Sequence, residues 1–398
     1  LRPGGPICLR PNPTPHHTTV SPHFTTLHDT VLHHTTTTLP YDYTCSVESQ
    51  TGVNPTHNYY LNVMTSAMIR VFCEVTSNVF QLHADCVEFS PCGEQALVGY
   101  YQLDETAKKR SGQIAKFQVV GNQAEKVCLL DTAGILDLSW MGSDFCLAAA
   151  SSGELYTIIS PKSQPLVISD VFAISESILL SSDCHGNMVV TSDECGIVYL
   201  VDPCKKKILD YWKGHDFEAW CVRLNRNDAN LILSGGDDCM ARVWDRRLGF
   251  AKPVISKRHE MGVCSISSVP GYCHFISTGC FDEKLRMWDL RGGGEILICH
   301  TSGGGVWRHK WSPSATKVLM ASMHAGFAVA SIDGQENIIE NTTGFDTSLT
   351  YYRQSAKLAY GVDWRIDADG KEHFKALIAT CSFYDNCVTF ATYKEQIG

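Results

Sequence analysis

The sequence has no long apolar run, no signal-type apolar core near its start and no paired-cysteine motif, and from these absences we expect neither a membrane-spanning nor a secreted nor a zinc-binding protein. No segment approaches the roughly 20 apolar residues of a membrane-spanning helix, and the N-terminal region lacks the apolar core of a signal peptide. The 18 cysteines are scattered without a C-x-x-C pair, so neither a zinc site nor a redox motif is indicated. Unpaired cysteines fit a reducing compartment, and we expect a cytoplasmic protein without membrane contacts.

Concentrated positive charge and the common catalytic motifs are also missing. The formal net charge is −9 and no basic run exceeds three residues, which disfavours a nucleic-acid surface. The chain contains no G-x-S-x-G, no H-E-x-x-H, no P-loop and no G-x-G-x-x-G after a predicted strand. We therefore expect no nucleic-acid partner, no metal and no cofactor.

What the sequence does contain is a repeat between Gly214 and Arg291. His215 precedes Trp244 by 29 positions, and the same interval recurs in a second copy. The two tryptophans are 44 residues apart, within the period of WD repeats. Each copy also places a hydroxyl residue ten positions before its tryptophan and an aspartate six before it. The second copy comprises His259, Thr278, Asp282 and Trp288, matching Ser234 and Asp238 of the first.

The repeat predicts a four-stranded sheet in which short alternating runs are strands and the Gly- and Asp-containing segments are turns. In such a sheet the His, the Ser or Thr, the Asp and the Trp form one hydrogen-bonded chain that locks a turn against the strands. A catalytic His–Ser–Asp triad has the same residue types. Because the set occurs once in each copy, the structural interpretation is favoured.

Five further units of similar length are predicted around these two. Together they fill the chain from about residue 80 to its end, which predicts an all-β, seven-bladed WD40-type β-propeller. The alternating segment Ile69–Val75 is predicted to complete the last blade, because an open ring leaves unpaired sheet edges. We expect a propeller over 67–398 and a disordered Thr-, His- and Pro-rich extension over 1–66.

Three motifs in the C-terminal half carry a resemblance to a known family. They are H-E-M-G-V-C-S from His259, G-G-V-W-R from Gly304 and C-S-F-Y-D from Cys381, in that order. The chain resembles the WD-repeat family of the diphthamide pathway, the diphthine methyl ester esterases, historically called diphthine methyltransferases. The resemblance implies a hydrolase that removes the methyl ester from methylated diphthine on translation elongation factor 2. Diphthine and methanol would be the products, and diphthine would later be amidated to diphthamide.

The resemblance supplies an activity but no catalytic residues, so the substrate contacts are predicted from chemistry. Methylated diphthine carries a trimethylammonium group, which aromatic faces and nearby carboxylates hold best. Aromatic residues at or near the starts of innermost strands are the candidates, although packing within a blade is an equal alternative for Trp364. The substrate-binding candidates are Trp220, Glu260, Trp307, Tyr360 and Trp364.

Ester hydrolysis needs a base and a donor for the developing oxyanion. His324 is the first candidate base, because it lies outside the repeating His positions on a predicted strand or at its end. Ser322, two residues earlier, would share a strand face with it and form a nucleophile–base pair. Arg308 could hold the carbonyl oxygen, with a salt bridge at the rim as the alternative. Asp363 and Glu260 could orient the base or attract the cation.

Two other functions remain open on the sequence alone, because the propeller fold hosts many activities. One is a non-catalytic scaffold, which a flat central mouth without an aromatic pocket would favour. The other is a substrate receptor for a cullin-type ubiquitin ligase. The segments 244–247 and 288–291 both fit the W-D-x-R pattern of such receptors, although that pattern is frequent in WD proteins generally.

Overall fold

The structure is a computed structural model that describes residues 59–64, 68–292, 294–301, 303–332, 347–352, 358–369 and 373–397. The chain divides into Leu1–Val53, which lies outside the described residues, and the compact unit Asn54–Gly398. Every regular element in the described ranges is a β-strand. The same ranges contain no helix with the length and apolarity needed to cross a membrane.

The compact unit consists of seven antiparallel sheets, called blades 1 to 7 here, and the first six each use four consecutive strands. Blade 1 contains β3 (His83–Phe89), β4 (Gln95–Asp104), β5 (Lys109–Val120) and β6 (Gln123–Ala133). Blade 2 contains β7 (Ile135–Trp140), β8 (Phe145–Ala150), β9 (Glu154–Ile159) and β10 (Val167–Ala173). Blade 3 contains β11 (Leu179–His185), β12 (Met188–Asp193), β13 (Ile197–Asp202) and β14 (Lys207–Lys213).

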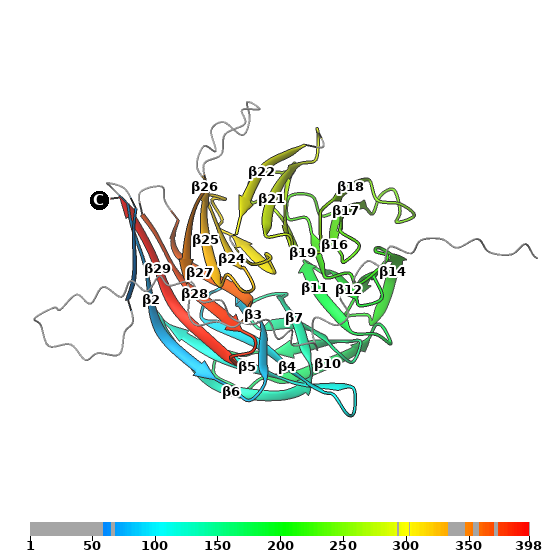
Figure 1. Ribbon diagram of the computed structural model, residues 1–398. Coiled ribbons are helices and arrows are strands. Elements are labelled where there is room, and N and C mark those ends of the chain that lie inside the picture. Colours follow the sequence, from blue (N-terminus) through cyan, green and yellow to red (C-terminus); the bar gives the residue numbers. More distant parts are fainter. Residues whose placement is uncertain are drawn as a thin grey trace, which may run out of the picture. The chain divides into compact units, whose positions relative to one another are not determined.

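The next three blades repeat the same order. Blade 4 contains β15 (Cys221–Leu224), β16 (Leu231–Gly235), β17 (Met240–Asp245) and β18 (Ile255–Arg258). Blade 5 contains β19 (Val263–Ser268), β20 (Phe275–Cys280), β21 (Lys284–Asp289) and β22 (Glu295–His300). Blade 6 contains β23 (Arg308–Trp311), β24 (Lys317–Ala321), β25 (Phe327–Ile332) and β26 (Thr347–Tyr352). The blades are arranged around a common axis, with the first strand of each blade innermost (Figure 1), so the predicted seven-bladed propeller is confirmed.

Blade 7 joins the two ends of the folded unit. Its strands β27 (Ala359–Asp369), β28 (His373–Ser382) and β29 (Cys387–Ile397) are followed by β2 (Met68–Val79) and β1 (Tyr59–Met64). The blue strand β2 runs antiparallel beside the red strand β29 in Figure 1, so the predicted closing strand is confirmed. The predicted boundary between the extension and the propeller was at residue 66. β1 lies within the expected extension, because it pairs with β2 as a fifth strand.

The hydrogen-bonded chain predicted for the first repeat is present in blade 4. His215 Nε2 lies 2.8 Å from Ser234 Oγ, which also accepts a 2.9 Å bond from Trp244 Nε1. The other ring nitrogen of His215 lies 2.8 Å from Asp238. The set is therefore structural, since it ties the turn before β15 to two strands of the same blade.

The second repeat makes only part of that chain. His259 Nε2 lies 2.8 Å from Thr278 Oγ1, and Trp288 Nε1 donates to the same oxygen at 2.9 Å. Asp282 forms an ion pair with Arg286 at 2.7 Å in place of the predicted bond to His259. The aspartate link thus differs between two copies of one sequence pattern: Asp238 contacts both His215 and Arg242, whereas Nδ1 of His259 lies 3.3 Å from the carbonyl oxygen of Lys257 instead.

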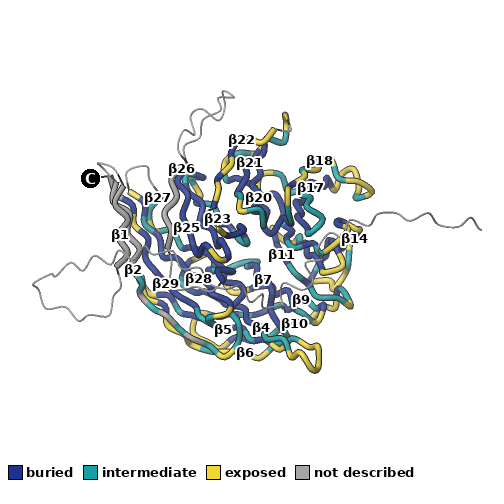
Figure 2. The backbone as a smooth tube through the Cα atoms, viewed as in Figure 1, coloured by how far each residue is buried: buried dark blue, intermediate teal, exposed yellow. Residues whose placement is uncertain are grey.

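Apolar side chains between neighbouring blades form the core. Phe117 of blade 1 and Phe390 of blade 7 are both fully buried, with ring centroids 5.0 Å apart. In Figure 2 the inner strands are mostly dark blue and the exposed positions gather on outer strands and turns. Burial of apolar area between the blades holds each innermost strand in a fixed position around the axis, and these strands carry the site described next.

Candidate functional site

The innermost strands of the seven blades share one arrangement of residues at or just before their first position. Each has a fully buried small or aliphatic residue at one position, and a second residue follows it immediately. In β3, β7, β11, β19 and β27 this second residue sits at a shift in register with the next strand, and in blades 4 and 6 it immediately precedes the strand. A bulge of this kind redirects a side chain without ending the strand. We call the seven residues the mouth ring: Asp85, Leu136, Leu180, Trp220, Cys264, Trp307 and Tyr360.

Three aromatic members of the mouth ring form a chain of ring contacts on one side of the axis. Trp220 and Trp307 have ring centroids 5.5 Å apart although blade 5 lies between their blades. Trp307 and Tyr360 follow at 4.7 Å. Both indoles are partly exposed, whereas Tyr360 is buried. The cluster therefore exposes part of its indole surface, and its tyrosine is buried against Trp307.

Aromatic residues from two further elements extend this cluster. Phe383, in the turn after β28, lies 4.8 Å from Tyr360 and 5.1 Å from Tyr101 of β4. His83 stacks on the other side of Phe383 at 4.6 Å. Phe383 belongs to the C-S-F-Y-D motif, so this motif contributes a residue to the aromatic cluster.

The glycines of the G-G-V-W-R motif permit close packing of the backbone beside the aromatic cluster. A Cβ on Gly304 would lie 2.0 Å from the carbonyl oxygen of Ser322. A Cβ on Gly305 would lie 2.8 Å from the backbone of Phe281. Any larger residue would push the loop outward, and Trp307 follows two residues later on that loop.

Beneath the aromatic cluster, Arg308 crosses between blades. Its Nη2 donates to Asp85 Oδ2 at 2.9 Å, and its Nη1 donates to Asp137 Oδ1 at 2.7 Å. A third bond from Nη2 reaches the carbonyl oxygen of Leu136 at 2.6 Å. The guanidinium thus bridges blade 6 to blades 1 and 2 and forms ion pairs with two buried carboxylates.

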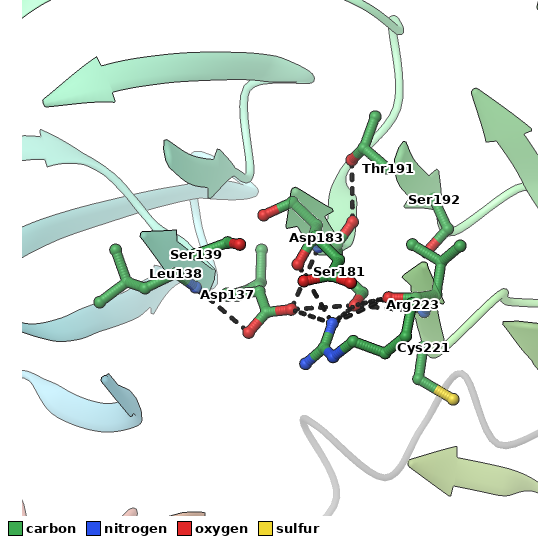
Figure 3. A network of polar contacts seen from close by, with 12 residues as sticks. Asp137, Leu138, Ser139, Ser181, Asp183, Thr191, Ser192, Cys221 and Arg223 are labelled. Carbon is green, nitrogen blue, oxygen red and sulfur yellow. Dashed lines mark hydrogen bonds and ion pairs between the residues drawn. The ribbon is translucent and has the colours of Figure 1, made fainter. Parts of the chain in front are cut away.

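Asp137 also belongs to a second set of contacts, which Figure 3 shows from close by. Arg223 Nη1 lies 3.0 Å from Asp137 Oδ2, and the same oxygen accepts a 2.9 Å bond from Ser181 Oγ. The backbone N–H groups of Ser182 and Leu138 also donate to this carboxylate. Burial alone would raise the pKa of Asp137, but Arg223 and Arg308 outweigh burial and hold the pKa well below its usual range.

Deeper along the same strands, Lys310 forms an ion pair with Glu88 and lies 3.9 Å from Asp363. Asp363 Oδ2 accepts a 2.7 Å bond from the backbone N–H of Phe89. Burial raises the pKa of Glu88 to about 7 and also raises the pKa of Asp363, although Lys310 opposes both shifts. Side chains of opposite charge, Lys310 with Glu88 and Asp363, therefore lie further along the inner strands than the aromatic cluster.

The structure brings together three of the four aromatic candidates. Trp220, Trp307 and Tyr360 are members of the mouth ring. Trp364 is elsewhere: its ring packs 5.5 Å from Phe374 in the core, and its Nε1 donates to the carbonyl oxygen of Trp311. The packing alternative holds for Trp364, which stands four positions after Tyr360 on β27 and contacts Phe374 there.

The polar candidates are dispersed. Arg308 lies directly below the cluster, whereas Asp363 lies deeper and faces Lys310. Glu260 is exposed before β19 and pairs with Lys284 at 3.1 Å. The structure thus gives Arg308 the most direct connection to the aromatic mouth.

The predicted Ser322–His324 pair does not form. Both residues follow β24, where Met323 makes an isolated bridge to Ala359 and a turn begins at His324. His324 is exposed, whereas Ser322 is fully buried and its hydroxyl has no hydrogen-bond partner among the described residues. The prediction of a shared strand face was wrong because the strand ends at Ala321 and the turn separates the two side chains.

Sequence reasoning missed two carboxylates of the site, Asp85 and Asp137. Asp137 stands between Leu136 and Leu138 in an otherwise apolar strand, and such an acid must be buried with a partner. That signal was available in the sequence. The identity of the partner was not, because Arg308 lies in a different blade.

The two W-D-x-R segments have matching geometries. Arg247 makes a two-pronged ion pair with Asp245, with its Nη2 2.6 Å from Oδ2. Arg291 does the same with Asp289, at 2.8 Å. Over the described ranges, no group of three or more His, Cys, Asp or Glu side chains is placed to hold a metal ion.

Comparisons with known proteins agree with this architecture. Residues 206–245 and 252–289 match the family described as WD domain, G-beta repeat. A diphthine methyltransferase homolog from Dictyostelium discoideum is 31% identical over 353 residues, which cover 77% of this chain and 95% of the relative. The human diphthine methyltransferase is 34% identical over 333 residues, or 71% of this chain and 73% of the relative. The Schizosaccharomyces pombe protein of that name is 31% identical over 77% of this chain and 93% of its own length.

Proposed function

Because this chain belongs to the family of proteins named diphthine methyltransferase, we propose that it acts on methylated diphthine in the diphthamide pathway as an ester hydrolase. It removes the methyl ester from methylated diphthine on translation elongation factor 2. Water enters the reaction, and diphthine and methanol leave it. The diphthine carboxylate is then free for later amidation.

The observation that carries this proposal is the aromatic cluster of the mouth ring together with the ion pairs next to it. Trp220, Trp307 and Tyr360 meet at the axis, and Arg308 with its two carboxylates lies directly beneath. A trimethylammonium group is attracted to the faces of tryptophan and tyrosine by roughly 0.5–2 kcal/mol for each favourable contact. An ester beside that cation would then lie near the carboxylates and the guanidinium.

Binding at a propeller mouth also suits a modified side chain that projects from a large protein. The reacting group enters the opening, while the rim formed by turns and loops contacts the surrounding surface of the elongation factor. His324 lies on one of these turns, after Met323, whose side chain packs in the aromatic cluster. His324, the first candidate base from the sequence, is exposed on this turn.

The name of the relatives describes methyl transfer, whereas the proposed reaction removes a methyl group. One experiment distinguishes methyl transfer from methyl removal. The purified chain is incubated with elongation factor 2 that carries methylated diphthine, and in parallel with factor that carries diphthine and a methyl donor. We expect loss of one methyl from the first substrate with release of methanol, and no change in the second. A gain of methyl in the second, without loss in the first, would replace hydrolysis with transfer.

A second candidate function rests on the matching W-D-x-R geometries. Arg247 and Arg291 have side chains 55% and 56% exposed, and each is fixed by its own aspartate. Two identical exposed features one blade apart suit a partner that contacts neighbouring blades, such as the adaptor of a cullin-type ubiquitin ligase. Pull-down of the purified adaptor by wild type, and its loss in the Arg247→Ala, Arg291→Ala double variant, would support this function.

A further inference from the structure

Asp85 is the one carboxylate in the mouth ring. The other six members are Leu, Cys, Trp or Tyr, so a single acid stands among apolar side chains at the level of the aromatic cluster. Asp85 occupies the bulge of β3, between Ala84 and Cys86. Blade 1 follows blade 7 around the axis, and a Cβ on Gly361 would come within 2.7 Å of the Asp85 carbonyl oxygen. Asp85 is therefore a direct neighbour of Tyr360.

The hydrogen bonding of Asp85 differs from that of Asp137, although both bind Arg308. Asp137 uses both oxygens: Oδ1 binds Arg308 and the Leu138 N–H, and Oδ2 binds Arg223, Ser181 and the Ser182 N–H. Among the described residues, the bond to Asp85 is made by Arg308 to Oδ2. Oδ1 of Asp85 thus accepts no hydrogen bond from the described part of the chain, and Arg308 fixes the orientation of the carboxylate through Oδ2.

We infer that Asp85 is the general base of the ester hydrolysis proposed above, and this inference rests on that function. The Asp85 carboxylate takes a proton from a water molecule, and the water oxygen forms a bond to the ester carbonyl carbon. When the tetrahedral intermediate collapses, the bond to the methoxy oxygen breaks, and the protonated Asp85 returns its proton to that oxygen. Methanol leaves, the new carboxylic acid releases its proton to solvent, and Asp85 is regenerated as a carboxylate.

The electrostatic surroundings suit this role. Burial raises the pKa of Asp85 to about 7, against the opposing attraction of Arg308. A general base is most effective when its pKa lies near the working pH. Arg308 acts as a positioning residue, since it holds Oδ2 and fixes the direction of Oδ1. The titratable and charged groups that face Asp85 from the surrounding strands are Arg308, Asp137, Tyr101, Tyr360, Cys86 and Cys381.

Glu88 supplies a matched control on the same strand. Its pKa is also raised to about 7 by burial, and it too is paired with a cation, Lys310. It lies three residues beyond Asp85, below the level of the aromatic cluster. Glu88→Gln therefore removes a similar buried acid without touching the mouth ring.

The test compares kcat and KM of wild type, Asp85→Asn and Glu88→Gln on methylated-diphthine elongation factor 2 across pH. We expect Asp85→Asn to lower kcat by about 10²- to 10⁴-fold with little change in KM. The fall of wild-type kcat on the acid side of about pH 7 should vanish in this variant. Glu88→Gln should retain both the rate and the acid limb.

A folded Asp85→Asn variant with a rate within a few-fold of wild type, or an equal loss in Glu88→Gln, overturns the inference and leaves the hydrolase proposal standing. If wild type itself releases no methanol, the proposed function fails and the inference fails with it. Should Asp85→Asn not fold, the pH dependence of wild-type kcat decides. A rate that does not fall below about pH 7 excludes a base with the raised pKa of Asp85.

Discussion

Trp220 and Trp307 come from blades 4 and 6, yet their indole rings lie 5.5 Å apart. Blade 5 contributes only the small side chain of Cys264 to the mouth ring between them. Two large side chains therefore meet over a small one, and the aromatic surface is concentrated on one side of the axis.

If this pair of indoles holds the trimethylammonium group, removing one indole should lower the affinity for the substrate more than it lowers the rate of the chemical step. We expect Trp307→Ala or Trp220→Ala to raise KM by about 5- to 30-fold, corresponding to roughly 1–2 kcal/mol of cation–π attraction. Trp364→Phe is the control, because Trp364 packs in the core and should leave KM unchanged. An unchanged KM in both mouth variants would remove the indoles from the binding site.

Arg308 should be important for stability as well as for the site. Arg308→Met leaves Asp85 and Asp137 buried without their shared cation, and we expect the free energy of unfolding to fall by about 3–5 kcal/mol. Urea denaturation of the two proteins measures the difference. A loss below about 1 kcal/mol would mean that the bridge across the axis is not maintained in solution.

Ser322 and His324 differ in burial, and neither is expected to act as the base. The Ser322 hydroxyl is buried without a partner, so Ser322→Ala should leave stability unchanged or raise it by up to about 1 kcal/mol, with activity retained. His324 is exposed, so His324→Ala should leave the melting temperature unchanged. We expect its kcat to fall much less than that of Asp85→Asn. An equal fall would return the role of the base to His324.

The two repeat aspartates should differ in their contribution to stability. Burial alone would raise the pKa of Asp238, but His215 and Arg242 overcome burial and lower the pKa to about 2. Asp282 is paired with Arg286 and does not bind His259. We expect Asp238→Ala to cost about 3 kcal/mol and Asp282→Ala about half as much. Equal losses in denaturant unfolding would contradict this difference.

His309 gives a prediction on pH. It is buried between Ser265 Oγ at 2.7 Å and Ser277 Oγ at 2.8 Å. Burial, with the charges of Arg223 and Lys310, lowers its pKa to about 3. The unfolded chain takes up this proton below about pH 6.5 while the native state does not, so the native state loses stability as the pH falls from about 6.5 towards 3.

His309→Gln removes that titration. The variant should be less stable than wild type at pH 7, and the difference should shrink by about 2 kcal/mol on going to pH 5. Unfolding curves of both proteins at the two pH values measure the change. A difference that stays constant would show that His309 can be protonated in the native state.

Local patterns predicted the blades and their closure. The interval from His215 to Trp244 and its recurrence in the next copy predicted a four-stranded sheet, and the alternation in Ile69–Val75 predicted the closing strand. These features depend on strand periodicity and on hydrogen bonds within a single blade. The prediction that Ser322 and His324 pair also depended on strand periodicity. It failed because β24 ends at Ala321 and a turn follows.

The sequence by itself determined the repeated sheet, the ring that the sheets close into, and the aromatic residues at the starts of inner strands. Only the tertiary structure decided which of these side chains meet. Asp85 and Arg308 come from the first and sixth blades, and their bond depends on a bulge in β3 and on the close packing of blades around the axis. Periodicity fixes the face of a strand on which a side chain lies, whereas the distance across the axis is set by the packing of all seven sheets.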